Sequence, residues 1–157
     1  DNARIQRVVD ATGATVVGLS DIYGVKADIF TPCALGGVIN DETIPQLQVE
    51  IVVGAANNQL LEDRHGDDLE ARGILYAPDY VANAGGVINV YSELTGWSRE
   101  RSLRKADEIY DTVLSVFRLA KDTNIPTYKA ADRVAEQRIQ AVRGMIQTWP
   151  KFPNRES

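Results

Sequence analysis

Short apolar runs alternate with polar segments through the first half of the chain. Each run has the length and composition of a buried strand: ATVV at 14–17, ADIF at 27–30, EIVV at 50–53 and GILY at 73–76. Residues 1–12 predict a helix that Gly13 ends, with Ile5, Val8 and Val9 on one side. A polar helix is expected from about residue 58 to 72, ended by Gly73.

Only a short helix fits between the second and third strands, because Pro45 in DETIPQL is tolerated just in a first turn. Strands that alternate with helices predict a parallel sheet with right-handed crossovers. We therefore expect an α/β chain with a doubly wound sheet.

Strand signals stop after Asn89, and two longer helices follow. Ser98 is available to cap the first and Thr127 the second. Apolar residues at three- and four-residue spacings predict core stripes on both: Leu103, Ala106, Tyr110, Val113, Leu114 and Phe117, then Tyr128, Ala131, Val134, Ala135, Ile139 and Val142. We expect one domain over residues 1–144 and a poorly ordered tail over 145–157.

Composition narrows the possible functions. The 157 residues are 44% hydrophobic and 25% charged, enough for one core, and the net charge of -5 argues against a nucleic-acid surface. The densest basic segment, residues 99–105, alternates with acidic residues and predicts a solvated helix face. Cys33 is the single cysteine, and no apolar run approaches the roughly 18 residues that span a bilayer. A cytoplasmic protein without membrane association is expected.

Candidate chemistry lies in the loops after the strands, because ligands bind beyond the carboxyl ends of parallel strands. These loops are TPCALGG at 31–37, GAANN at 54–58 and APDYVANAGG at 77–86. Asn57 and Asn58 offer uncharged amide donors and acceptors, which suit a carboxamide or carboxylate. Each loop taken alone could be a tight turn, and the asparagines could cap a helix. Their occurrence after three strands favours a ligand site.

The motifs that carry these loops form a longer pattern: IFTPCALGGVINDETIPQL, VVGAANNQL, DRHGD, GILYAPDYVANAGGVINV and IYDTVLSVF. In order and spacing, to about Arg143, they resemble the coenzyme domain of the glutamate, leucine, phenylalanine and valine dehydrogenases, the leucine dehydrogenase branch above all. The resemblance implies a Rossmann-like domain, truncated at its amino terminus and followed by two carboxy-terminal helices. It also implies NAD-dependent oxidative deamination of an L-amino acid to a 2-oxo acid and ammonia.

The resemblance also assigns site residues. The CALG segment, Cys33, Ala34, Leu35 and Gly36, would run beside the coenzyme and contact it mainly through backbone atoms, so Cys33 is not implied to be a nucleophile. Ala56 and Asn57 would reach the coenzyme, and Asn57 and Asn58 the substrate. Val87 and Val90 would line the pocket for the substrate side chain. Two apolar, β-branched walls favour leucine, isoleucine or valine over glutamate.

The family's catalytic lysines and aspartate, and its GxGxxG loop, have no counterpart in this chain, so we expect no catalytic residue here and an inactive chain when alone. A homo-oligomer is expected for the full protein. Two alternatives stay open: a non-catalytic nucleotide- or amino-acid-binding module, and a dehydrogenase of phenylalanine or tryptophan. The choice of NAD over NADP rests on the family branch.

Other polar and aromatic residues suit structural roles. His65 is expected in an exposed loop or helix start rather than as a general base. Asp79, after Pro78, suits a turn or cap at least as well as ligand contact. Trp97 and Trp149 are expected to be packing or surface aromatics. No metal-ligand spacing is present.

Overall fold

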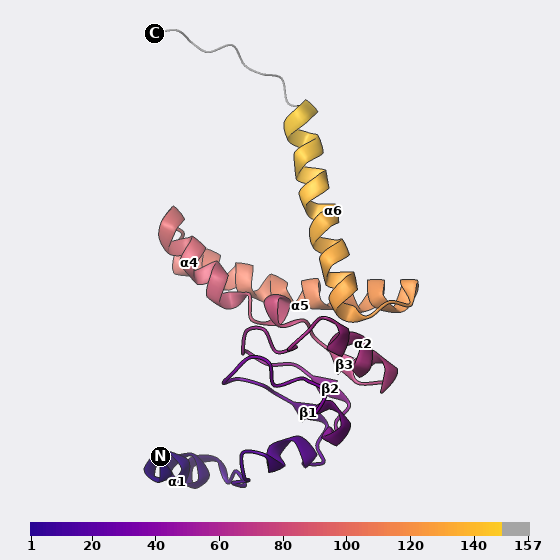
Figure 1. The fold of residues 1–157 in the computed structure, drawn as a ribbon. Helices are drawn as coiled ribbons and strands as arrows, with labels where there is room; N and C mark the ends of the chain where they lie inside the picture. The colour runs from indigo at the N-terminus through magenta and orange to yellow at the C-terminus, as the bar shows by residue number, and fades with distance from the viewer. Residues whose placement is uncertain (149–157) are drawn as a thin grey trace.

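The computed structural model describes the backbone of residues 1–148 and the side chains of residues 1–144. A small sheet lies near the centre, between the amino-terminal helix and the long carboxy-terminal helices (Figure 1). The elements follow in the order α1 (Asn2–Thr12), η1 (Asp21–Gly24), β1 (Ile29–Phe30), η2 (Ile44–Gln46), β2 (Ile51–Val52), α2 (Arg64–Ala71), β3 (Leu75–Tyr76), α3 (Asp79–Ala82), α4 (Gly85–Thr95), α5 (Arg99–Thr123) and α6 (Thr127–Thr148).

The sheet has three parallel strands in the order β1-β2-β3, as predicted from the second, third and fourth apolar runs. Ile51 of β2 stands opposite both Ile29 and Leu75. Each strand is shorter than its apolar run. The chain is therefore an α/β fold with a parallel sheet, and its two long helices follow as expected.

The predicted strand at 14–17 is wrong. These residues are neither strand nor helix, and Val16 and Val17 are 58% and 38% exposed. Within residues 1–148 this segment has no neighbouring strand, and a strand persists only where another backbone accepts and donates its hydrogen bonds. The preceding helix is correct, because the Asp1 side chain caps α1 and Gly13 ends it at φ 71°.

The helix between β2 and β3 begins later than predicted, at Arg64 instead of about residue 58. Asn58 has φ 53°, which no right-handed helix allows, and Leu60 forms a bridge to Ile39 instead. η2 confirms the short helix around Pro45. Both elements cover the main core, formed by Ile39, Ile44, Leu47, Val52, Leu69, Ile74 and Tyr76.

The loop expected at 77–86 instead contains α3 and the start of α4, which continues to Thr95. Ser98 caps α5 as predicted, through a bond from the Arg101 N–H. The predicted core stripes are wrong in part, because Leu103, Tyr110 and Ile139 are 55%, 69% and 60% exposed. The buried contact between α5 and α6 is shorter: Val116, Ala120, Ala130 and Ala131.

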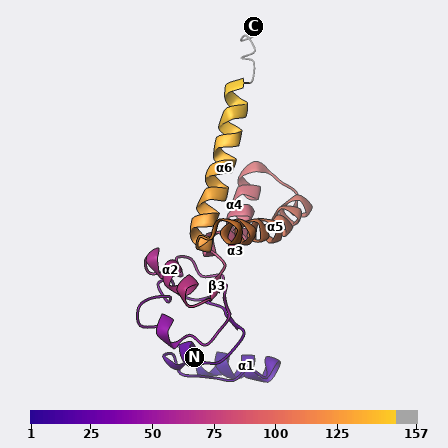
Figure 2. The same ribbon diagram turned by 90° about the vertical axis from the view of Figure 1, so that its right-hand side faces the viewer.

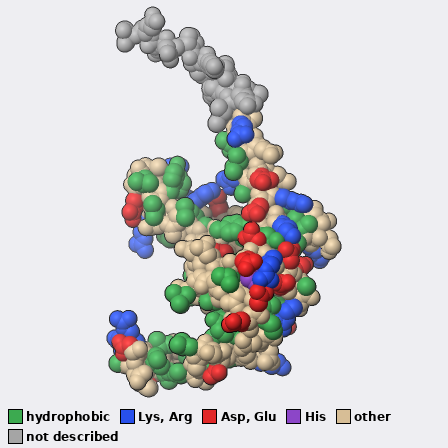
Figure 3. All heavy atoms as spheres, in the orientation of Figure 1, with side chains coloured by type: hydrophobic (Ala, Val, Ile, Leu, Met, Phe, Trp, Pro, Cys, Tyr) green, Lys and Arg blue, Asp and Glu red, His purple; other side chains and the backbone are tan. Residues whose placement is uncertain are grey.

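The second half of α6 projects away from the other helices, which is why its stripe stays exposed (Figure 2). α6 continues to Thr148, so its last turn falls within the predicted tail, and residues 149–157 lie outside the described part of the chain. Among residues 1–148, no helix combines the length and apolar character that crossing a membrane requires. Figure 3 shows hydrophobic side chains on the surfaces of α1 and α4.

Candidate functional site

Because β1, β2 and β3 are parallel, the loops that follow them meet at one edge of the sheet. These are residues 31–37, 53–58 and the segment from 77 that turns into α3 and α4. In the first loop Cys33, Ala34, Leu35 and Gly36 are all exposed. In the second, Ala56 is 6% exposed while Asn57 and Asn58 are exposed. The structure therefore presents the predicted coenzyme-binding segments together.

The first two loops lie in direct contact. The Gly37 N–H donates to the Asn58 carbonyl at 2.7 Å, and the Ala56 N–H donates to the Pro32 carbonyl at 3.0 Å. A Cβ added to Gly36 would lie 2.7 Å from the Asn57 carbonyl oxygen, closer than real Cβ atoms come to other atoms. Glycine is thus required at position 36 for the two loops to touch.

Asn83 brings the third loop to the second. Its side-chain Nδ2 donates to Oδ1 of Asn57 at 2.6 Å and lies 3.4 Å from the Ala55 carbonyl. With its oxygen occupied in this way, the exposed Asn57 amide keeps its NH2 group as a donor for a ligand. Sequence reasoning placed Asn83 in the third loop without a role. The only indication of a role in the sequence is that this amide side chain precedes three small residues, 84–86.

Asp79 also joins the third loop to the second. It is 8% exposed, and its Oδ2 accepts from the Asn58 N–H at 2.7 Å while its Oδ1 accepts from the Tyr76 hydroxyl at 2.8 Å. Burial and the neighbouring Asp79 carboxylate raise the pKa of Tyr76 above its ordinary value, so Tyr76 stays protonated and donates. Asp79 is thus the first residue of α3, but its carboxylate contacts the second loop instead of capping that helix.

Val87 and Val90, the predicted walls of the side-chain pocket, lie in the first two turns of α4. They are 73% and 58% exposed. Tyr91 and Leu94 on the same helix are 51% and 80% exposed. α4, which begins two residues after Asn83, therefore offers an exposed apolar face.

His65 is fully buried in the first turn of α2, so the expected exposure is wrong although the helix-start position is right. Its Nδ1 accepts from the Glu62 N–H at 3.0 Å, which leaves the proton of the neutral ring on Nε2, 3.5 Å from Asp41. Asp41 and Asp68 complete a group whose donor atoms lie within 4.8 Å of one another.

Arg64 already neutralises that group. It binds Asp41 through two hydrogen bonds of 2.7 and 2.6 Å and holds the pKa of this carboxyl at about 2. A metal ion bound at Nε2 would need a deprotonated nitrogen there and a displaced arginine. The arrangement therefore favours an ion-pair cluster that fixes the start of α2.

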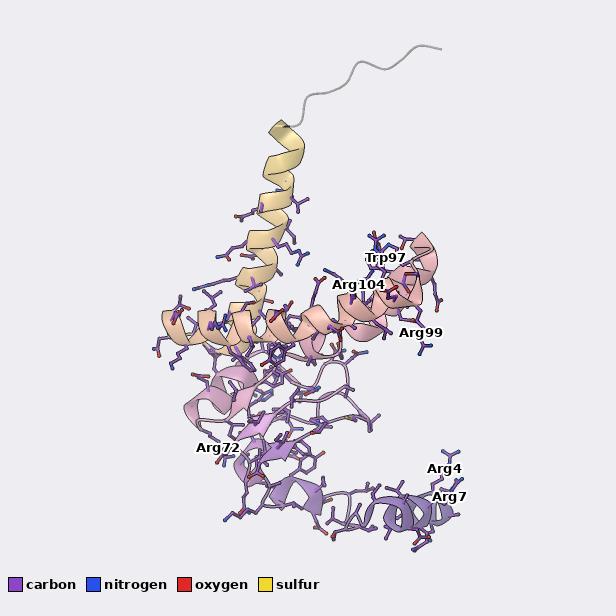
Figure 4. All side chains as sticks on the ribbon, turned by 180° about the vertical axis from the view of Figure 1, so that it is seen from behind. Arg4, Arg7, Arg72, Trp97, Arg99 and Arg104 are labelled. Carbon is purple, nitrogen blue, oxygen red and sulfur yellow. The ribbon has the colours of Figure 1, made fainter. Side chains whose placement is uncertain are left out.

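The arginines labelled in Figure 4 do not gather on one surface. Arg4 and Arg7 belong to α1, Arg72 follows α2, and Arg99 and Arg104 belong to α5. On α5, Arg104 pairs with Glu100, and both side chains are largely exposed, as expected for a solvated helix face. Trp97 is a surface aromatic: its ring meets Tyr91 edge-on at 5.1 Å and lies under the Arg101 guanidinium at 4.1 Å. Trp149 lies outside the described residues.

Comparison with known proteins gives consistent matches. The family model described as Glutamate/Leucine/Phenylalanine/Valine dehydrogenase matches residues 2–145. A leucine dehydrogenase from Geobacillus stearothermophilus is 58% identical over 139 residues, which are 88% of this chain and 38% of that protein. A phenylalanine dehydrogenase from Caldalkalibacillus thermarum is 55% identical over 124 residues, 79% of this chain and 34% of that protein.

The crystal structure of L-tryptophan dehydrogenase from Nostoc punctiforme superposes on this chain with a TM-score of 0.88 at 48% identity. The match covers 91% of this chain and 43% of the crystallised one. The chain thus spans well under half the length of each of these relatives.

Proposed function

We propose, from the premise that this chain belongs to the glutamate/leucine/phenylalanine/valine dehydrogenase family, that it forms part of an NAD-dependent amino-acid dehydrogenase. The reaction would be oxidative deamination of a branched-chain or other apolar L-amino acid to a 2-oxo acid and ammonia. The observation that carries this proposal is the joined pair Asn57–Asn83, at the strand edge where the three loops meet. The residues that act on the substrate proton would lie outside this chain.

The residues present suit NAD. Residues 33–36 are all exposed, so this loop is accessible to a flat ligand, while Gly36 lets it lie directly against Asn57. The fixed amide of Asn57 offers donors at the position expected for a carboxamide or carboxylate. When bound, the nicotinamide ring accepts the hydride that leaves the substrate. Asn57 and Asn58 would orient the two reactants towards each other.

Val87 and Val90 support an apolar substrate. Covering their exposed, uncharged side chains with a hydrocarbon side chain lowers the free energy of the complex. They offer no partner for a second carboxylate. Leucine, isoleucine or valine fits this wall best. The relatives that act on phenylalanine and tryptophan keep an aromatic substrate as the second candidate.

The rest of the proposal concerns the whole protein. It is a cytoplasmic homo-oligomer, with the amino-acid substrate as its partner and neither nucleic acid nor membrane as a ligand. Residues 1–144 form a partial coenzyme domain within it. This chain alone carries no turnover, because the groups that would remove the substrate proton are not among its residues.

A chimera tests the function. The matching segment of the Geobacillus stearothermophilus leucine dehydrogenase is replaced by residues 1–144 of this chain, and NADH formation is followed with leucine, valine, phenylalanine and tryptophan. Turnover that is fastest with leucine or valine, and that Asn57→Ala reduces at least about tenfold, supports the proposal. A chimera that assembles as the parent does and yet forms no NADH with any of these amino acids contradicts it.

Titration of the isolated chain with NADH separates the binding-module alternative. The dehydrogenase proposal expects weak binding, since only one side of the coenzyme site is present. Tight binding by the isolated chain together with an inactive, well-assembled chimera would favour the non-catalytic module.

A further inference from the structure

The backbone of Asn58 stands in an uncommon conformation. Its φ of 53° lies in the left-handed region, which costs a residue other than glycine free energy unless the surroundings hold it. Within the described residues, the only other non-glycine with a positive φ is Asn124, at the ordinary left-handed end of α5. Asn58 ends no such helix. It sits at the turn that presents Asn57.

Two bonds hold the Asn58 residue from opposite sides. Its carbonyl accepts from the Gly37 N–H at 2.7 Å, and its N–H donates to the Asp79 carboxylate at 2.7 Å. The first bond comes from the first loop, residues 31–37, and the second from the start of α3. A charged acceptor makes the second the stronger of the two, because bonds to ionised groups exceed those between neutral groups.

Asp79 is itself fixed by a buried chain of hydrogen bonds. The Tyr76 hydroxyl donates to it at 2.8 Å, and the carbonyl of Tyr76 accepts from the Thr127 hydroxyl at the start of α6 at 2.6 Å. Tyr76, Asp79 and Thr127 are only 3%, 8% and 5% exposed. The acceptor for Asn58 is therefore anchored in the core, while the loop that it holds is exposed.

We propose that Asp79 is a positioning residue, which holds Asn58 in the left-handed conformation and thereby aims the Asn57 amide at the ligand. Asp79 is only 8% exposed and would act through Asn58. This inference deepens the proposed function and rests on it for its catalytic consequence, but not for its structural one.

The chain offers a matched set of variants. Asp79→Ala removes the acceptor of Asn58. Tyr76→Phe removes the hydroxyl that donates to the same carboxylate and accepts from the Asp79 N–H at 3.3 Å, and it leaves the bond to Asn58 in place, so it controls for the loss of buried hydrogen bonds. Asp79→Asn keeps an acceptor for the Asn58 N–H, since the Tyr76 hydroxyl can turn to accept from the new amide.

Amide hydrogen exchange on this chain gives the structural readout. The reporter is the Gly37 N–H, which donates to Asn58 and loses no partner in any variant, and the reference is the Val53 N–H, which donates to Phe30 inside the sheet. In Asp79→Ala, exchange at Gly37 relative to Val53 should accelerate about tenfold or more, against about threefold in Tyr76→Phe, which loosens the carboxylate but keeps the acceptor of Asn58. Asp79→Asn should recover most of the protection. Equal acceleration in Asp79→Ala and Tyr76→Phe would overturn the inference.

If Asp79→Ala alone does not fold, the same change is made in the Asn58→Gly background. Glycine takes a positive φ without cost, so Asp79→Ala should then affect Gly37 exchange by less than about twofold. An undiminished effect of about tenfold in that background would refute a role in holding the conformation.

The chimera gives the catalytic readout. Asp79→Ala should raise the KM for the amino acid about tenfold, with Tyr76→Phe between this value and that of the parent and Asp79→Asn close to the parent. Identical KM values in Asp79→Ala and the parent chimera would overturn the positioning role. A parent chimera without turnover would count against the proposed function alone, since the exchange experiment still decides the role of Asp79.

Discussion

Replacing Gly36 with alanine should force the first two loops apart. The added Cβ would lie 2.7 Å from the Asn57 carbonyl oxygen and 2.9 Å from that of Asn58, whereas ordinary contact begins near 3.4 Å. Both obstructing atoms are backbone, so neither can swing aside as a flexible side chain would. The loops must therefore separate by about 0.7 Å, the difference between 3.4 and 2.7 Å.

That separation has a calculable cost. The Gly37 N–H bond to Asn58, 2.7 Å long, would stretch towards about 3.4 Å, and weakening a backbone bond to this extent costs up to about 1 kcal/mol. Local overpacking adds about 1–3 kcal/mol. Since the loop is exposed and can relax, we expect Gly36→Ala to lower the free energy of unfolding by about 2 kcal/mol.

Urea unfolding of the chain, followed by circular dichroism, measures this value. The control is Gly86→Ala, since a Cβ there meets nothing within 4 Å and Gly86 lies in the first turn of α4. Alanine should leave stability unchanged or raise it by up to about 1 kcal/mol at that position. Equal stability of Gly36→Ala and the parent chain would refute the claim that the two loops touch.

Three further changes have defined outcomes. Gly66→Ala should separate α2 from α6, because its Cβ would lie 2.5 Å from the Tyr128 ring, and urea unfolding should show a loss of about 1–3 kcal/mol. Arg64 lowers the pKa of Asp41 from 3.8 to about 2, so the stability from this pair is present above pH 3.8 and is lost as pH falls towards 2. Melting temperatures over that range should fall less in Asp41→Asn than in the parent, and parallel curves would contradict the pairing. Val87→Ala should raise the chimera's kcat/KM for phenylalanine relative to leucine by about tenfold, with little change in stability since Val87 is 73% exposed.

Local rules predicted the elements whose determinants lie close together in sequence. Asp1 and Gly13 delimit α1, Ser98 caps α5, and the apolar runs at 27–30, 50–53 and 73–76 contain the three paired strands. In each case the deciding feature is a cap, a left-handed glycine or a short apolar run. Such features act within a few residues and need no knowledge of the rest of the fold.

The errors fall where distant residues decide. The run at 14–17 has a strand's composition without a neighbouring strand in the described part of the chain, and composition cannot supply one. His65 sits in a charged segment, yet it is fully buried, and the residue that faces its Nε2 is the distant Asp41, which also pairs with Arg64. Asn58 delays α2 because its N–H goes to Asp79 and its carbonyl to Gly37.

The same distinction applies to the candidate site. The three loops could be found by position, because parallel strands must end at one edge, and the structure confirms that they meet. The contacts between the loops could not be found in this way. They join Asn83 to Asn57 and Asp79 to Asn58, between the segments that follow β3 and β2. Such pairings depend on strand register, which shifts every side chain if it slips by one residue. The geometry of a site that is built from adjacent loops of a parallel sheet therefore depends on how the core holds those loops. Buried residues such as Asp79 are then as important to this geometry as the exposed amides.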